Sequence, residues 1–225
     1  MRIFNNVNIP RNYKRSALAI GNFDGIHKGH QKVFKRTKRF ANRKKIKFGV
    51  LTFTPLPIIF FNKKIKNFRL VSERRKFELF EKYGVDFIIN IRFNKNFSET
   101  SAEKFIKKII HKKINPQLLS VSNNFKFGRK RKGDIRLLKK YNNECDYRLL
   151  NVPSFKYKGK IVSSTRIRKS IQNGKIHLAN KLLSRTWFVE GIVLRGKKLG
   201  RKLGYRTCNI HIKDYILPKL GIYVV

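Results

Sequence analysis

The sequence predicts an α/β fold, in which a parallel sheet carries helices on its faces. Two observations support this prediction. Short apolar segments alternate with amphipathic helical segments through most of the chain, as strand–helix–strand units do. The first unit contains a glycine-rich loop directly after the apolar segment 18–20. Because ligands bind beyond the carboxyl ends of parallel strands, this loop is the first candidate site.

The loop covers residues 21–30, with the sequence Gly-Asn-Phe-Asp-Gly-Ile-His-Lys-Gly-His, and a helix is expected over residues 31–41. The start of a helix presents free backbone N–H groups and a positive dipole end to an anion, and glycines let a phosphate approach the backbone. His27 and His30 add two donors on nearly the same side of this helix. The loop therefore predicts a nucleotide phosphate site.

The other elements follow from similar patterns. Strands are expected at residues 46–53, 85–91 and 118–121, and helices after the N-cap Ser72, after a capping box at 100–103, after residues 163–165 and over 176–183. Prolines at 55 and 57 interrupt the chain. The apolar run 58–61 then either packs in the local core or forms a wall for a flat aromatic substrate, and the sequence favours the core.

Two more polar clusters follow expected strands. The first, residues 122–134, is a basic loop bounded by glycines that carries two phenylalanines. The second places the hydroxyls of Ser163, Ser164 and Thr165 before Arg166 and Arg168. The hydroxyls could cap the helix while the arginines stay solvated, or both could bind phosphate oxygens. The glycine–histidine loop favours the second interpretation.

The composition is strongly basic. The 225 residues include 55 Lys and Arg against 12 Asp and Glu, a formal net charge of +43. Such a charge is typical of nucleic-acid binding, but these residues are spread along the whole chain, and a general drift toward Lys, Asn and Ile explains the spread equally well. We favour the drift, so no specific nucleic-acid partner is expected.

Several other classes of protein are disfavoured. Cys145 and Cys208 lie far apart, which argues against a disulfide framework and against structural zinc. No apolar run approaches the roughly 18 residues of a membrane span, and the N-terminus lacks the apolar region of a secretory signal. We expect a cytoplasmic protein that does not bind membranes. The pattern predicts no particular oligomeric state.

The character of the chain changes near Ser184–Arg185, which divides it into residues 1–184 and residues 185–225. Strand-like alternation at residues 188–194 and 205–210 predicts a β-type second part. This segment of about 40 residues is too short to bury a core alone.

The clusters suggest that the protein handles a nucleoside triphosphate. The sequence has neither a Walker A loop nor a covalent nucleophile beside a base. Histidines, backbone amides and arginine fit direct in-line transfer, in which positioning and charge stabilisation lower the barrier. In nucleotidyl transfer, His27 and His30 would brace the phosphate oxygens and Arg168 would hold the leaving pyrophosphate. Mg²⁺ would accompany ATP, held largely by phosphate oxygens and water.

The motifs, taken in order, resemble those of the prokaryotic bifunctional riboflavin kinase/FMN adenylyltransferases, also called FAD synthetases. The resemblance extends over essentially the whole chain and rests on residues 21–30, 51–57, 101–105, 124–128, 133–134 and 163–168. It implies adenylyl transfer from ATP to FMN, giving FAD and pyrophosphate, in an N-terminal nucleotidyltransferase domain of Rossmann-like fold. It also implies phosphorylation of riboflavin by ATP in a C-terminal β-barrel, of which residues 185–225 would form an incomplete part.

The resemblance assigns roles residue by residue. His27, His30 and Arg168 would be the catalytic residues. The ATP-binding residues would be Gly21, Asn22, Phe23, Asp24, Gly25, Gly29, Ser163, Ser164 and Thr165, and the flavin-binding residues Asn124, Phe53 and Phe125. Thr207 and Asn209 resemble the kinase motif that serves nucleotide and magnesium.

The chain also differs from the family pattern. Thr54 and Leu56 stand where the family usually has an acidic residue and a histidine, and Ser122 replaces a usual glycine. Arg206 and Cys208 replace the proline and alanine of the kinase motif. The position of the usual kinase glutamate would lie beyond Val225. We therefore expect adenylyl transfer to remain and kinase activity to be lost, so that riboflavin, ATP and magnesium should give no appreciable FMN.

Three alternatives stay open at this stage. The chain could transfer a nucleotide to another small phosphate acceptor, although the later motifs argue against this. It could be a basic RNA-binding protein, in which case binding should collapse with salt. It could also be an inactive remnant of the family, as the differences at Thr54 and Leu56 suggest.

Overall fold

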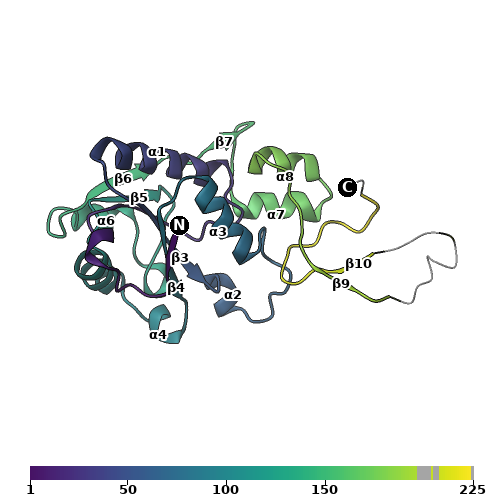
Figure 1. Cartoon of the computed structure of the whole chain (residues 1–225), viewed down its shortest axis with the longest axis horizontal. Helices are drawn as coiled ribbons and strands as arrows, with labels where there is room; N and C mark the ends of the chain where they lie inside the picture. The colour runs from purple at the N-terminus through teal and green to yellow at the C-terminus, as the bar shows by residue number, and fades with distance from the viewer. Residues whose placement is uncertain (197–203, 205–207, 224–225) are drawn as a thin grey trace.

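The computed structural model describes residues 1–196, 204 and 208–223, and Figure 1 shows their arrangement. At the centre is a six-stranded sheet in the order β1-β4-β3-β2-β5-β6, in which every neighbouring pair is parallel. The strands are β1 (Arg2–Phe4), β2 (Ala17–Ile20), β3 (Phe48–Thr54), β4 (Phe87–Arg92), β5 (Leu118–Ser122) and β6 (Arg148–Val152). The predicted α/β fold with a parallel sheet is confirmed.

Helices connect the strands and cover the sheet. They are α1 (Lys28–Lys44), α2 (Pro57–Phe61), α3 (Glu73–Lys82), α4 (Lys95–Ser98), α5 (Ala102–Lys104), the π-helix η2 (Phe105–Ile114), α6 (Ile135–Lys140), α7 (Ser164–Gln172) and α8 (Ile176–Leu183). Short 3₁₀ turns lie at η1 (Arg11–Tyr13) and η3 (Arg129–Arg131), and a small hairpin at β7 (Lys156–Tyr157) and β8 (Lys160–Ile161). None of the described helices is long and apolar enough to cross a membrane.

The sheet separates two hydrophobic cores, because successive side chains of a strand point to opposite faces. Leu18 and Ile20 of β2 pack with helices η2 and α6 on one face, whereas Ala17 and Ala19 pack with α1 and α3 on the other. Helices α7 and α8 form a third cluster with Leu70. Both faces of the sheet are thus covered, as is usual for parallel sheets.

The strand order reverses its direction between β2 and β5. From β2 the chain continues through β3 to β4 on one side, while β5 and β6 lie on the other side. A crevice forms at the carboxyl ends of the strands where an open α/β sheet changes direction, and ligands bind there. The glycine loop follows β2, and the basic loop follows β5.

Most of the elements expected from the sequence are present, and the boundaries of the predicted strands in the central sheet are shifted by up to two residues. Helix α8 has the predicted bounds, and Ser72 caps α3 through a hydrogen bond from the N–H of Arg75. One cap was wrongly predicted. Ser101, not Thr100, accepts the N–H of Lys104, because the helix begins one residue later than the capping box implied.

The apolar run 58–61 differs from its favoured interpretation. It forms the short helix α2, which buries none of its residues, and Ile58 and Phe61 are 46% and 69% exposed. Both side chains face a cavity that is described below. The favoured interpretation, packing in the local core, is therefore wrong, and the wall for a flat aromatic substrate stays a prediction.

The part after Ser184 contains an antiparallel pair of strands, β9 (Ile192–Leu194) and β10 (Asn209–His211), which extends away from the sheet in Figure 1. Residues 214–216 return to the body and dock on the segment 68–72. The carbonyl of Asp214 accepts N–H bonds from Phe68 and Arg69, and the N–H of Ile216 donates to the carbonyl of Arg69. The predicted strands were longer than β9 and β10, and residues 205–207 lie outside the described part of the chain.

Candidate active site

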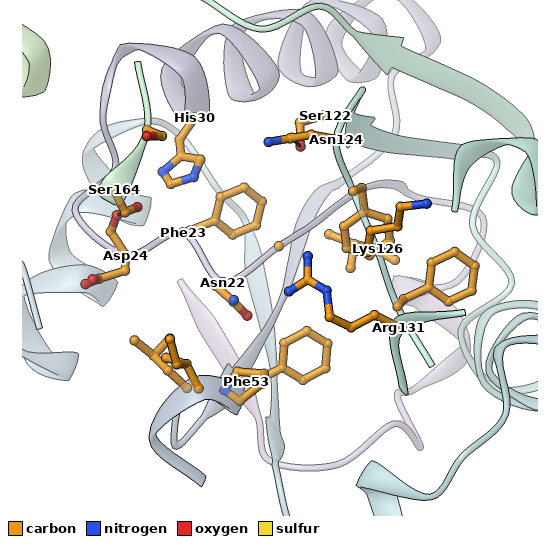
Figure 2. Close-up of a pocket in the computed structure, with 18 of the residues that line it drawn as sticks. Asn22, Phe23, Asp24, His30, Phe53, Ser122, Asn124, Lys126, Arg131 and Ser164 are labelled. Carbon is orange, nitrogen blue, oxygen red and sulfur yellow. Dashed lines mark hydrogen bonds between the residues drawn. The ribbon is translucent and has the colours of Figure 1, made fainter. Parts of the chain in front are cut away.

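A cavity of about 860 Å³ lies at the carboxyl ends of the central strands (Figure 2). It brings together residues predicted from separate parts of the sequence: Gly21, Asn22, Phe23, Asp24, His27, Gly29, His30, Phe53, Asn124, Phe125, Ser163, Ser164, Thr165 and Arg168. Two predicted residues do not line it. Gly25 lies behind the cavity wall, where its φ of +81° is one that glycine adopts without strain, and Asn209 belongs to β10.

The two histidines form one end of the cavity. His27 is the N-cap of α1, and its Nδ1 accepts the N–H of Gly29 at 3.1 Å. His30 stacks on it with 3.7 Å between ring centroids. Since Nδ1 of His27 accepts a hydrogen bond, the proton of the neutral ring is on Nε2. His27 is therefore a neutral hydrogen-bond donor held at the start of a helix.

Burial keeps both rings neutral. It lowers the pKa of His27 to about 4, with the charges of Arg168 and Arg185 acting in the same direction. Burial also lowers the pKa of His30 well below its usual value, assisted by His27 and Arg185. The positive end of a helix dipole adds to this preference for the neutral form. A bound phosphate would act in the opposite direction, because an anion favours the imidazolium.

The lowered pKa of His27 predicts a loss of stability in acid. The folded state disfavours the imidazolium, so this contribution is complete above the unfolded pKa of about 6.5 and is lost as the pH falls toward 4. Between pH 7 and pH 5, wild-type protein should lose about 2 kcal/mol more unfolding free energy than a His27→Asn variant. Urea unfolding at both pH values measures this difference, and equal losses in the two proteins would contradict it.

Asp24 and Arg168 form a buried ion pair next to the histidines, with side chains 5% and 12% exposed. Asp24 also accepts the N–H of Leu70, and Nε of Arg168 donates to the carbonyl of Phe68 at 2.8 Å. Burial raises the pKa of Asp24 and lowers that of Arg168, while the attraction between the two charges opposes both shifts. Arg168 thus joins α7 to the glycine loop, and its guanidinium lines the cavity.

The three hydroxyls at the start of α7 have different roles. Ser163 is the N-cap and accepts the N–H of Arg166, as the simpler interpretation predicted. Ser164 donates to the carbonyl of Asp24 at 2.8 Å, and Thr165 is exposed at the cavity. Arg166 points away and donates to carbonyls of the β7–β8 hairpin. Of the two arginines, only Arg168 lines the cavity.

The opposite end of the cavity is aromatic. Phe53 lies at its floor, and Phe125 stacks on Phe127 with 5.4 Å between ring centroids and 17° between ring planes. Phe61 and Phe93 also line the cavity, and their rings pack edge to face against each other. Apolar, flat surfaces of this kind suit a planar aromatic ligand. Asn124 lies at the boundary between the two ends and accepts a hydrogen bond from Ser122 at 2.8 Å.

Thr54, one of the differences noted in the sequence, is bonded below the cavity. Its hydroxyl interacts with Glu73 at 3.1 Å and with Asn90 at 2.9 Å. Leu56 lines the cavity and is buried. Thr54 thus holds neighbouring side chains together through its hydroxyl, and Leu56 contributes an apolar side chain to the cavity wall.

Arg185 was missed by the sequence analysis. Its guanidinium donates to the carbonyl of Gly25 at 2.8 Å and reaches those of Ile26 and Leu183 at longer distance. It therefore holds the glycine loop from behind. No local pattern marks this role, because the contact joins residues 160 positions apart in the chain.

No group of three His, Cys, Asp or Glu side chains that could hold a metal occurs among the residues described. Thr207, one of the two residues linked to a metal by the kinase motif, lies outside those residues. Asn209 pairs with Leu194 in the hairpin of β9 and β10, remote from the cavity lining. Both metal assignments stay predictions.

The parallel sheet, the helix N-terminus with its two histidines and the arginine-bearing second helix define an α/β nucleotidyltransferase with a Rossmann-like fold. Comparison with known proteins supports this class. The FAD synthetase family model matches residues 9–166 and the riboflavin kinase model matches residues 183–225. The chain belongs to the bifunctional riboflavin kinase/FMN adenylyltransferase family.

Individual relatives agree with this assignment. The bifunctional riboflavin kinase/FMN adenylyltransferase of Buchnera aphidicola from Schizaphis graminum is 40% identical over 97% of this chain and 70% of its own length. The Haemophilus influenzae enzyme of the same name is 34% identical over 97% of this chain and 71% of its own. A crystal structure of a Streptococcus pneumoniae protein described as a macrolide-efflux protein has a TM-score of 0.84 at 26% identity, covering 97% of this chain and 71% of that one.

Proposed function

We propose that this protein transfers the adenylyl group of ATP to FMN, forming FAD and pyrophosphate. The observation that carries the proposal is one cavity with two chemically different ends, a phosphate-binding end at His27 and His30 and an aromatic end at Phe53 and Phe125. A nucleoside triphosphate and a planar flavin would meet between them. The membership of the chain in the FAD synthetase family supports the same reaction.

The reaction is an in-line displacement. An oxygen of the FMN phosphate attacks the α-phosphorus of ATP, the bond to the oxygen that bridges to the β-phosphorus breaks, and pyrophosphate leaves with that oxygen. The Nε2–H of His27 and the ring of His30 hydrogen-bond phosphate oxygens at which negative charge increases. These donors are already fixed before the reaction, so little reorganisation is needed at the transition state.

The second helix completes the phosphate-binding end. Arg168 binds the leaving pyrophosphate with guanidinium N–H groups that are not used by Asp24 and Phe68. Thr165 offers a hydroxyl at the helix start that bonds to none of the residues the structure describes. Asp24 acts as a positioning residue, because it holds Arg168 and the backbone of Leu70 together.

Magnesium would enter with ATP. The described part of the cavity offers no carboxylate cluster for the ion, which fits an Mg²⁺ that is held by phosphate oxygens and water. Bound in this way, Mg²⁺ would neutralise part of the triphosphate charge, while His27, His30 and Arg168 position the phosphates.

The proposal is tested by incubating the protein with FMN, ATP and MgCl₂ and separating the flavins by chromatography. We expect stoichiometric formation of FAD and pyrophosphate. A parallel reaction with nicotinamide mononucleotide in place of FMN tests the alternative of another phosphate acceptor. The proposal is wrong if FAD does not exceed the amount formed by a His27→Ala, His30→Ala double variant.

A further inference from the structure

Four cationic side chains line the cavity: Lys126, Lys130, Arg131 and Arg168. Two of them are already paired, since Lys126 binds Asp134 at 3.1 Å and Arg168 binds Asp24. The side chains of Lys130 and Arg131 have no hydrogen-bond or ion-pair partner among the residues that the structure describes. Figure 2 shows that the guanidinium of Arg131 points into the cavity, toward the side on which Asn22 and Phe23 lie.

The backbone of the loop after β5 is strained at Lys130 and Arg131, the two residues that carry these side chains. Lys130 and Arg131 are consecutive non-glycine residues with positive φ, at 51° and 57°. L-residues rarely adopt this conformation, and backbone strain of this kind collects at functional sites. The two positive φ angles therefore mark this loop as a place to look for function.

Contacts at both ends of the loop hold this conformation. The N–H of Arg129 donates to the carbonyl of Thr100, and that of Arg131 to the carbonyl of Gly128. Gly128, with φ at +71°, lies so close to the start of α5 that a Cβ would come within 2.6 Å of the backbone nitrogen of Ala102. The loop is therefore fixed against α5, and Arg131 is presented from a rigid support.

We propose that Arg131 binds the phosphate of the acceptor and thereby selects a phosphorylated flavin over an unphosphorylated one. This inference rests on the proposed function and adds to it a residue that determines specificity. A planar guanidinium binds a phosphate through two parallel N–H···O bonds, which also fix the orientation of the attacking oxygen.

The repulsion between the two substrates supports this role of Arg131. The reaction brings the dianionic phosphate of the acceptor to the anionic phosphates of ATP, and the two groups repel each other. His27, His30 and Arg168 line the proposed ATP end of the cavity, whereas Arg131 comes from the loop after β5, which also carries Phe125 and Phe127. An unpaired cation there offsets the repulsion on the acceptor side.

Steady-state kinetics of Arg131→Gln test the proposal. We expect the KM for FMN to rise roughly 10- to 100-fold, as for the loss of a charge-assisted hydrogen bond, while the KM for ATP stays unchanged. Riboflavin lacks the phosphate, so its inhibition constant against FMN should stay the same in the variant. Arg131→Lys keeps the charge but cannot form two parallel hydrogen bonds. Its KM for FMN should lie between those of the wild-type protein and Arg131→Gln.

Lys132→Gln is the matched control, because Lys132 is exposed, belongs to the same loop and does not line the cavity. It should leave all three constants unchanged. A rise in the KM for ATP alone, or equal weakening of FMN and riboflavin in Arg131→Gln, would overturn the inference. If the wild-type protein forms no FAD, the proposed function itself fails. If Arg131→Gln is active and its KM for FMN is unchanged, only the inference about Arg131 fails.

Discussion

Replacing His30 with alanine is expected to lower kcat for FAD formation by about 10²- to 10³-fold, the usual effect of removing one donor to a developing oxyanion. His30 is stacked on His27 at the phosphate end, and the low pKa of each ring leaves it neutral before ATP binds. His27→Ala should reduce kcat at least as much, because it also removes the acceptor for the N–H of Gly29.

Rates at saturating FMN and ATP measure this effect, and His177→Ala provides the control. His177 is an exposed residue of α8 that does not line the cavity, so its loss should not change kcat. His27→Asn retains an acceptor for the N–H of Gly29 and separates the structural role from the catalytic one. Near wild-type kcat in both alanine variants would exclude the histidines as catalytic residues.

The second large effect is expected at the buried ion pair. Arg168→Met leaves the carboxylate of Asp24 in a site where it is 5% exposed and without its cation, which should destabilise the fold by about 3–5 kcal/mol. FAD formation should fall as well, because the proposed contact with pyrophosphate is lost. Urea unfolding followed by circular dichroism measures the change in stability.

Two further variants test whether the loss of stability comes from breaking the buried ion pair between Asp24 and Arg168. In Asp24→Asn, Arg168→Met neither charge of this ion pair remains, so the double variant should be more stable than the sum of the single effects predicts. Arg15→Gln breaks an exposed ion pair with Asp146 and should change stability far less. An Arg168→Met protein as stable as Arg15→Gln would show that the buried pair contributes no more than a surface pair.

The sequence predicted the central strands and main helices because their periodicity is set by burial. Strands β2 to β5 are mostly apolar and are covered on both faces, so they stand out without any tertiary information. The edge strands β1 and β6 were missed. Each contains exposed residues and depends on one neighbour, so hydrogen bonding to that neighbour, more than apolar content, defines it as a strand.

The candidate site was predictable where its chemistry is local. The glycine loop and its two histidines form one contiguous segment at a strand end, and the phosphate end could be inferred from that segment alone. The role of Arg185 and the pairing of Asp24 with Arg168 could not be predicted from the sequence, because these contacts join residues more than 140 positions apart. The role of α2 was also hidden, since exposed apolar residues beside a cavity have the same composition as a core.

The segment 68–72 connects the phosphate end to the C-terminal part of the chain. On one side the carbonyl of Phe68 and the N–H of Leu70 are bonded to Arg168 and Asp24; on the other, Arg69 is bonded to residues 214 and 216. Binding of a nucleotide at the phosphate end and docking of residues 214–216 therefore depend on the same segment. A nucleotide that binds more tightly when the C-terminal part is docked would strengthen that docking by the same factor.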